Sequence, residues 1–395
     1  MKHLPASLLI LSLSISFSYS QTYTDSLHIA LDKAFAQIQL PGFACLIATK
    51  DSILYQRGFG LADRENMIPF TEHTIQSIGS ITKTFLALAV MQLVEQKKLR
   101  LQSRINDLLP FSVHHPIYPD HPITVKHLVT HTSGIQDSYW DVVKATIMIE
   151  KFDLKNMTFP EEYYQHAKAF NKNRFMPLGT YLKRMLDKKG RWYDANKSFT
   201  TYEPGSNYQY SNIASALCGY IVECVSGQRF DEYVAQHILH PLNMTNAHWT
   251  FGEMVETDHA VGYFDNGAIV PPSYYIIYPA GGLRTSVSEL GLYVQEMLRG
   301  MQGEGTLLSP SSYRIMFTTQ FEGGDHPGVF WDTSPTSINH NGGSQGTYNL
   351  LLLNKKNQIG KILMTNTHAH WFDHLENQFH SIWRTMTTYQ ELLKP

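Results

Sequence analysis

Short apolar runs separated by polar turns stand near both ends of the chain. An apolar run at Gly42–Ala48 is followed, after a short polar turn, by a second run at Ile53–Tyr55, and this pattern predicts a β-hairpin. Close to the other end, runs at Tyr348–Leu353 and Ile359–Met364 flank a polar turn and predict a second hairpin. Both terminal regions are therefore expected to contribute strands to a sheet.

Helical patterns precede, separate and follow these hairpins. Ser26–Gln37 and Ile213–Val225 have helical character, and Trp371–Leu393 predicts a final amphipathic helix. Ile81–Val94 is apolar almost all round, and such a helix belongs in a protein core.

Strands at both ends with helices between them predict an α+β fold. We expect one antiparallel sheet built from both chain ends and flanked by helices, with a mostly helical region inserted into it. The α/β part is expected at about residues 21–105 and 255–395, where strand-like character returns past Gly262, and the helical part at about 106–254. No internal repeat or low-complexity linker divides the chain.

The N-terminus has the pattern of an export signal. A short cationic start precedes the serine-diluted apolar run Leu8–Phe17, and Ser18 and Ser20 are small residues at the positions that a signal peptidase reads. We therefore expect a cleavable signal peptide at residues 1–20 and a periplasmic or secreted mature protein. The alternative, a buried N-terminal helix, explains this pattern less well. No later segment has the run of roughly 18 apolar residues of a membrane span.

Composition and charge narrow the classes of partner. Of the 395 residues, 43% are hydrophobic and 17% are charged, as in an ordinary globular protein. The 32 Lys and Arg residues against 34 Asp and Glu give a net charge of −2, which argues against nucleic acid or anionic lipid as partners. Three cysteines are too few for a disulfide scaffold, and we expect Cys45, Cys218 and Cys224 to be buried apolar residues.

Lys83 is the most unusual residue of the apolar helix. A lysine at the head of such a helix loses its hydration unless something uses it, and burial lowers its pKa. Ser80 lies three residues earlier, on the same face, where the helix N-terminus supplies backbone N–H groups. This arrangement predicts an activated serine with a base and oxyanion donors at hand. The competing interpretation makes Ser80 a helix cap and extends Lys83 to solvent.

Two later segments offer groups that suit the same chemistry. Tyr210 stands in a loop before a predicted helix, where a hydroxyl near an ammonium can lose its proton and act as a general base. The amide of Asn212 can bind Lys83 or a substrate carbonyl. His340 is followed by Asn341 and two glycines, which let the backbone approach a ligand and leave the second glycine's N–H as an oxyanion donor.

Together these motifs resemble those of a known superfamily. Ser80-x-x-Lys83, Tyr210-x-Asn212 and His340-x-Gly342, in this order, are similar to the serine β-lactamases and penicillin-binding proteins, and most to the branch of class C β-lactamases, DD-peptidases and related esterases. The resemblance extends from near residue 26 to the last helix. Further matching stretches are Thr124–Gly134, Pro204-Gly205 and Pro279–Leu283.

The resemblance implies a role for each of these residues. Ser80 would be acylated, Lys83 and Tyr210 would shuttle protons, and the N–H groups of Ser80 and Gly343 would bind the oxyanion. Residues Asn212, His340 and Gly342 would contact or orient a small-molecule or peptide substrate. No metal or organic cofactor is implied.

Two departures from the family pattern bear on the substrate. His340 stands where many members have a lysine, and would supply a weaker and pH-dependent positive charge for a substrate carboxylate. The segment at about 138–200 is long and rich in aromatic residues, and could form one wall of the substrate cleft. Both favour an exported esterase or peptidase over a dedicated β-lactamase. A penicillin-binding sensor that barely turns over and a non-catalytic ligand-binding relative remain the alternatives.

Two other motifs are candidates for a competing site. Residues 342–346 match Gly-x-Ser-x-Gly, but a nucleophile elbow needs a helix directly after its serine, and a strand is predicted there. The stretch from His368 to His374 is similar to a metallo-β-lactamase zinc motif, with one residue too many before its Asp-His pair. We expect a solvated helix start there and no metal. His131 is expected to hold its loop by hydrogen bonds.

Overall fold

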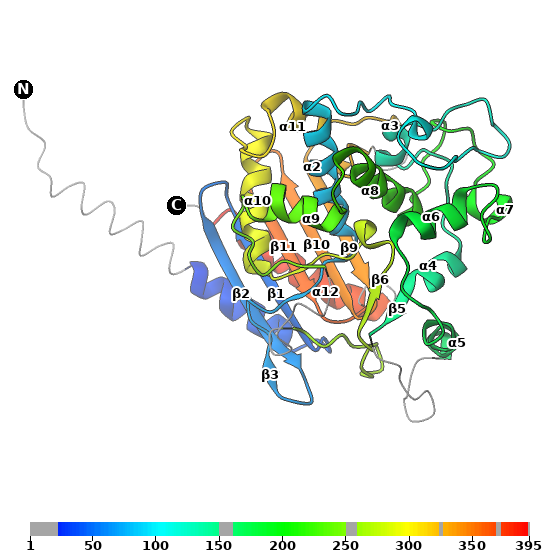
Figure 1. Ribbon diagram of the computed structural model, residues 1–395. Coiled ribbons are helices and arrows are strands. Elements are labelled where there is room, and N and C mark those ends of the chain that lie inside the picture. Colours follow the sequence, from blue (N-terminus) through cyan, green and yellow to red (C-terminus); the bar gives the residue numbers. More distant parts are fainter. Residues whose placement is uncertain (1–22, 150–160, 250–258, 324–326, 369–372, 394–395) are drawn as a thin grey trace, which may run out of the picture.

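An antiparallel sheet of seven strands joins the two ends of the chain, in the order β3-β2-β1-β11-β10-β9-β8 (Figure 1). This confirms the predicted α+β fold and its origin in both termini, because β1 from the first hairpin pairs directly with β11 from the last. The strands are β1 Gly42–Ala48, β2 Ile53–Asp63, β3 Ile68–Pro69, β8 Asp332–Thr333, β9 Ser337–Ser344, β10 Thr347–Asn354 and β11 Gly360–Thr365.

The computed structural model describes residues 23–149, 161–249, 259–323, 327–368 and 373–393. The predicted signal peptide at residues 1–20 lies outside this part of the chain. Within it, no helix is both long enough and apolar enough to span a bilayer.

Helices cover both faces of the sheet. On one face α10 (Val287–Met301) packs on the central strands, next to α2 (Thr82–Glu95). On the other face a helix of residues 23–35 and α12 (Asp373–Tyr389) bury a separate hydrophobic cluster against the sheet. All residues of β1 and β11 are buried, which explains why these strands are continuous apolar runs rather than alternating ones.

The inserted region is mostly helical, as predicted. Its helix α8 (Asn212–Ser226) packs against α2 and carries the loop that contains Tyr210 on its N-terminal side. The other helices and one strand that the structure describes are α3 Val125–Val129, α4 Tyr139–Ala145, β5 Thr146–Met148, α5 Glu161–Phe170, α6 Leu178–Leu186, α7 Ala195–Ser198, α9 Phe230–Val234, α11 Pro310–Phe317, and the short helices η1 Gly79–Ile81, η2 Ile105–Asp107, η3 Ala235–Leu239 and η6 Tyr278–Ala280. Two small sheets pair β5 with β6 (Ser273–Tyr275) and β4 (Gln76–Ser77) with β7 (Arg284–Thr285).

Three local predictions differ from the structure. The region past Gly262, expected to be strand-like, contains the long helix α10, whose Gly291 weakens the helical pattern but allows close approach to the sheet: a Cβ there would lie 2.6 Å from the Leu46 side chain. The second strand of the first hairpin continues to Asp63 instead of ending at Tyr55. Cys224 is exposed, whereas the other two cysteines are buried as expected.

Candidate active site

Ser80, Lys83 and Tyr210 meet in one hydrogen-bonded cluster. The Ser80 hydroxyl oxygen accepts from Lys83 Nζ at 3.0 Å and from the Tyr210 hydroxyl at 2.7 Å. Ser80 lies in η1, directly before α2, and its side chain caps neither helix. The helix-cap interpretation of Ser80 is therefore wrong, as is the solvent-exposed position for Lys83, whose side chain is 0% exposed.

The surroundings of Lys83 fix the direction of its lone pair when it is neutral. Nζ donates to the side-chain oxygen of Asn212 at 2.8 Å and to the backbone oxygen of Ala280 at 2.5 Å, and neither oxygen can donate in return. A neutral amine has two N–H donors, and these two acceptors use both. Its lone pair then points to the third neighbour, the hydroxyl of Ser80.

The protonation of the cluster follows from burial. Desolvation lowers the pKa of Lys83 to about 7, against the opposing charge of Asp137, so a large fraction of the amine is neutral at neutral pH. Burial raises the pKa of Tyr210 well above its ordinary value, and its hydrogen bond with Ser80 offsets this only in part. In the free protein burial therefore opposes the expected loss of a proton from Tyr210, and Lys83 is the better proton acceptor.

Asp137 is a residue of the site that the sequence did not reveal. Its carboxylate accepts from the Ser211 hydroxyl at 2.7 Å, from the backbone N–H groups of Asn212 and Ile213 at 2.8 and 3.0 Å, and from the Asn212 amide nitrogen at 2.9 Å. The free backbone N–H groups at the N-terminus of α8 stabilise the negative charge of this carboxylate. By holding the amide nitrogen, Asp137 turns the amide oxygen of Asn212 toward Lys83.

His131 makes structural hydrogen bonds, as predicted, but the loop that they hold is the one that carries Tyr210. Its Nδ1 accepts from the backbone N–H of Ser211 at 3.2 Å, and its backbone oxygen accepts from Gln209 at 2.7 Å. Its ring centroid lies 4.4 Å from that of Tyr210. Burial lowers the pKa of His131 well below its ordinary value, so the ring remains neutral and adds no charge beside Lys83.

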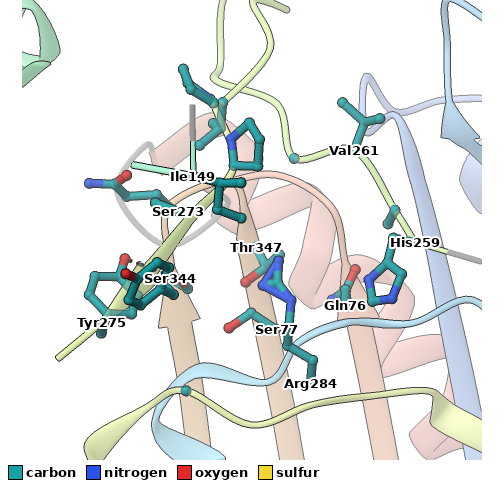
Figure 2. Close-up of a pocket in the computed structure, with 18 of the residues that line it drawn as sticks. Gln76, Ser77, Ile149, His259, Val261, Ser273, Tyr275, Arg284, Ser344 and Thr347 are labelled. Atoms are coloured by element: carbon teal, nitrogen blue, oxygen red, sulfur yellow. Dashed lines mark hydrogen bonds between the residues drawn. The ribbon is translucent and has the colours of Figure 1, made fainter. Parts of the chain in front are cut away.

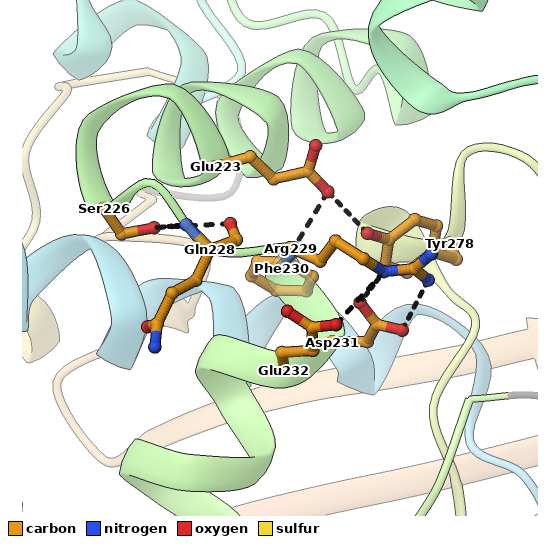
Figure 3. Close-up of polar contacts among 8 residues, drawn as sticks. All are labelled: Glu223, Ser226, Gln228, Arg229, Phe230, Asp231, Glu232 and Tyr278. Carbon is orange, nitrogen blue, oxygen red and sulfur yellow. Dashed lines mark hydrogen bonds and ion pairs between the residues drawn. The ribbon is translucent and has the colours of Figure 1, made fainter.

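The backbone oxygen that Lys83 contacts is held in place by η6. Tyr278, at the start of this turn, donates from its hydroxyl to Glu223 on α8 at 2.6 Å (Figure 3). The same carboxylate oxygen accepts from the backbone N–H of Phe230 at 3.1 Å, and thereby ties η6 to both α8 and α9 (Figure 3). The position of Ala280 therefore depends on the carboxylate of Glu223 on α8.

Glycines bring β9 against the turn that carries Ser80. A Cβ on Gly342 would lie 2.0 Å from the backbone oxygen of Ile78, and a Cβ on Gly79, which has a φ of +53°, would lie 2.7 Å from that of Gly343. Gly342 is buried, so it serves this backbone contact rather than ligand approach, whereas Gly343 is exposed. The backbone of Gly343 consequently lies beside the residue that precedes Ser80.

His340 is a buried neutral side chain. Its Nδ1 lies 2.6 Å from the backbone oxygen of Asn341, so this nitrogen carries the proton and Nε2 is an acceptor. Burial and the charge of Lys83 lower the pKa of His340 to about 4. The positive charge that we expected it to offer a substrate carboxylate is therefore absent at neutral pH.

The competing motifs do not form sites. Ser344 ends β9 and a tight turn leads to β10, so no helix follows it and the nucleophile elbow is excluded. His368 is 2% exposed and accepts from the backbone N–H of Gly346, which contradicts the expected solvated position. Residues 369–372 of the zinc-like stretch lie outside the described residues. Among those that the structure describes, no three His, Cys, Asp or Glu side chains are arranged to hold a metal.

The aromatic residues that the structure describes in the segment at 138–200 differ in their surroundings. Trp140 is 51% exposed, and Trp192 packs against Tyr181. Tyr163 donates to the side chain of Gln345 at 3.3 Å, just beyond β9. The side chains of Tyr139, Phe152 and Tyr164, in the same segment, are not among those described.

A cavity of about 440 Å³ is lined by residues that are close neighbours in the chain of Ser80, Ala280 and Gly343. Ser77, Gly281 and Ser344 belong to its lining, as do Gln76, Tyr275 and Arg284 (Figure 2). These residues come from β4, β6, β7, the turn after η6 and the end of β9. A cavity of this volume suits a small ligand or part of a larger one.

Comparison with known proteins agrees with this geometry. The Beta-lactamase family model matches residues 30–380. Protein flp of Staphylococcus aureus (strain MW2) is 22% identical over 354 residues, which are 86% of this chain and 63% of flp. Esterase EstB of Burkholderia gladioli is 29% identical over 234 residues, which are 58% of this chain and 52% of EstB. The chain therefore spans only about half to under two thirds of these curated relatives.

A solved structure repeats the fold over most of the chain. The octameric penicillin-binding protein homologue from Pyrococcus abyssi has a TM-score of 0.67 and 26% sequence identity. The match covers 87% of this chain and 73% of that one.

Proposed function

The chain belongs to the beta-lactamase family, which includes serine hydrolases, and we propose that it is an exported serine hydrolase that acts through an acyl-enzyme on Ser80. One observation carries the proposal: Lys83 is fully buried, has a pKa of about 7, and has both amine donors held by acceptors so that its lone pair faces Ser80. The substrates are esters, amides or D-amino-acid peptides. The name of the esterase relative supports the first of these classes.

Acylation follows from the geometry of the cluster. Neutral Lys83 takes the proton of Ser80, and Ser80 Oγ attacks the substrate carbonyl carbon. The negative charge that develops on the carbonyl oxygen is stabilised by the backbone N–H groups of Ser80 and Gly343. Lys83, now an ammonium, returns a proton through the hydroxyl of Tyr210 to the leaving group as the bond to it breaks. The products are the Ser80 ester and the protonated leaving group.

Deacylation reverses these roles with water as the nucleophile. Lys83 or Tyr210 removes a proton from water as its oxygen attacks the acyl carbon, and the proton passes to Ser80 Oγ as the ester bond breaks. Asn212 and His340 bind and orient the reacting groups. In this scheme Asn212 acts mainly on Lys83, because both ends of its amide are held by Lys83 and Asp137.

A small substrate panel tests the proposal. Nitrocefin, p-nitrophenyl esters and D-alanyl peptides are assayed together, and intact-mass spectrometry follows the protein for hours after penicillin exposure. Turnover of at least one substrate class with a transient Ser80 adduct is expected. A penicillin adduct that persists without turnover of any substrate would instead identify a penicillin-binding sensor, and absence of both would leave a ligand-binding relative.

Replacing Asp137 by Asn is expected to shift the pH dependence of hydrolysis. The charge of Asp137 raises the pKa of Lys83. Without that charge the amine becomes neutral at lower pH, so the rising limb of kcat/KM should move below pH 7, and the plateau should fall about tenfold because Asn212 is held less well. The pH–rate profile of p-nitrophenyl ester hydrolysis measures both changes.

Asp141 offers a matched control for this variant. It accepts from the backbone N–H of Ser138 at 2.9 Å, in a capping box at the start of α4, without contacting Asn212. Asp141→Asn should lower the melting temperature and leave the limb unmoved. If the rising limb of the pH–rate profile is also unshifted in Asp137→Asn, Asp137 acts only as a helix cap and does not influence Lys83.

Gly342→Ala is expected to lower both stability and activity. A Cβ at 2.0 Å from the Ile78 oxygen requires β9 to move away from η1, which displaces Gly343 from Ser80. We expect ester hydrolysis to fall at least about tenfold and the unfolding free energy to fall by about 1–3 kcal/mol. Gly227→Ala is the control: it has a φ of +75° but no atom within 4 Å of an added Cβ, so it should lose stability alone. Equal activity in the two variants would contradict the backbone contact proposed for Gly342.

A further inference from the structure

The cavity has a positively charged group among the residues that line it. Arg284 lies on β7, and Figure 2 shows its side chain extending past Ser77 toward Thr347, among the residues that line the cavity. Burial lowers the pKa of Arg284 only to about 10, so the guanidinium remains charged at neutral pH. The described residues that line the cavity include no Asp, Glu or Lys.

The neighbours of Arg284 are neutral hydrogen-bonding groups. His259 also lines the cavity, and burial together with the charge of Arg284 lowers its pKa to about 3, so the imidazole adds no second charge. The hydroxyls of Ser77, Thr347 and Tyr275 and the amide of Gln76 complete the polar end. Apolar residues also line the cavity, among them Ile149, Val261, Ile269, Val270, Pro271 and Pro272.

The cavity adjoins the proposed reacting groups through three chain neighbours. Ser77 pairs with Arg284 in the β4–β7 ladder, lies three residues before Ser80, and accepts from the backbone N–H of Gly79 at 3.2 Å. Ser344 directly follows Gly343, and Gly281 directly follows Ala280. Three residues of chain span at most about 10 Å, so an acyl group on Ser80 with a few methylenes comes within reach of the long Arg284 side chain.

We propose that this cavity receives the acyl part of the substrate and that Arg284 binds a carboxylate at the end of that acyl part. The proposal rests on the acyl-enzyme function proposed above and defines its substrate class: acyl groups with an apolar stem and a terminal carboxylate. A guanidinium binds a carboxylate through two parallel hydrogen bonds, and the low polarity of the cavity strengthens them. Arg284 also has contacts within the fold, and its five N–H donors allow it to serve a ligand carboxylate as well.

A pair of chromogenic esters that differ in one charge tests this proposal. 4-Nitrophenyl hydrogen adipate has a carboxylate at the end of a four-methylene stem, and 4-nitrophenyl 5-carbamoylpentanoate has a neutral amide in its place. We expect kcat/KM at pH 8 to favour the carboxylate by at least about tenfold. Arg284→Met should abolish that preference, and Arg284→Lys should retain part of it.

Arg57→Met, at an exposed position of β2, is the control and should keep the full preference. Equal kcat/KM for the two esters in the wild type, or a preference that survives Arg284→Met, would overturn the proposal.

A binding measurement separates failure of this proposal from failure of the proposed function. Adipate is added to the Ser80→Ala protein, and the thermal shift is compared with that caused by adipamide. Stabilisation by adipate that disappears when Arg284→Met is added supports the carboxylate site even if neither ester is hydrolysed. No stabilisation by adipate overturns the carboxylate site even if neutral esters are hydrolysed.

Discussion

Ser80→Ala is expected to lower ester hydrolysis by at least about 10³-fold, because the variant lacks the oxygen that forms the acyl-enzyme. The Ser80 hydroxyl is the atom on which Lys83 Nζ and the Tyr210 hydroxyl converge, at 3.0 and 2.7 Å. Its removal deletes no helix cap, so the folded state should be preserved. Hydrolysis of p-nitrophenyl esters, with circular dichroism on the same samples, measures both quantities.

A serine with a purely structural role provides the control. Ser309 caps α11 by accepting from the backbone N–H of Ser312 at 3.3 Å, and Ser309→Ala should lose about 1 kcal/mol of stability while it retains activity. The two serine variants should therefore show opposite patterns. Substantial hydrolysis in Ser80→Ala would refute the nucleophile assignment.

Lys83→Met is expected to reduce the rate of acylation by about 10²–10⁴-fold, the usual contribution of a positioned general base. In the wild type, rising pH through about 7 converts Lys83 to the neutral base, so kcat/KM should rise with pH and level off above pH 8. His131 and His340 have pKa values displaced downward and stay neutral in this range, which leaves a single rising limb. Lys83→Met should lose that limb.

The loss of activity should not come from unfolding. The lowered pKa of Lys83 means that the unfolded chain binds its proton more tightly, so the lysine costs stability fully below about pH 7 and progressively less as pH rises toward 10.5. Methionine removes this cost. Lys361→Met is the matched control, because Lys361 is also buried, with a pKa lowered to about 8, but it lies beside Thr387 and Trp383, away from Ser80. If Lys361→Met were as inactive as Lys83→Met, a general effect of losing a buried lysine would be responsible.

The parts of the site that the sequence predicted are those set by local spacing or by motif. Ser80 in η1 and Lys83 in the first turn of α2 are three residues apart on consecutive helical turns, so their contact follows from local spacing. Tyr210 and Asn212 were assigned from a motif, and the structure brings both to Lys83 and Ser80. The sheet was predictable because both hairpins have apolar strands around polar turns.

The parts that the sequence did not predict depend on distant pairings and on burial. Asp137 contacts Asn212 across 75 positions, and no periodicity joins them. Arg284 reaches the cavity only because the two-residue strands β4 and β7 pair, and strands so short have no pattern of their own. The neutrality of His340 follows from its burial, which residue identity alone does not specify.

The pH dependence of Ser80 labelling by a fluorophosphonate probe tests most directly whether the buried amine activates this hydroxyl. Labelling is followed by peptide mass spectrometry from pH 5 to 10. A single modified serine, Ser80, with a rate that reaches half its maximum near pH 7 is the expected result. Labelling spread over other serines, or a rate at Ser80 that climbs without a break to pH 10, would contradict the account.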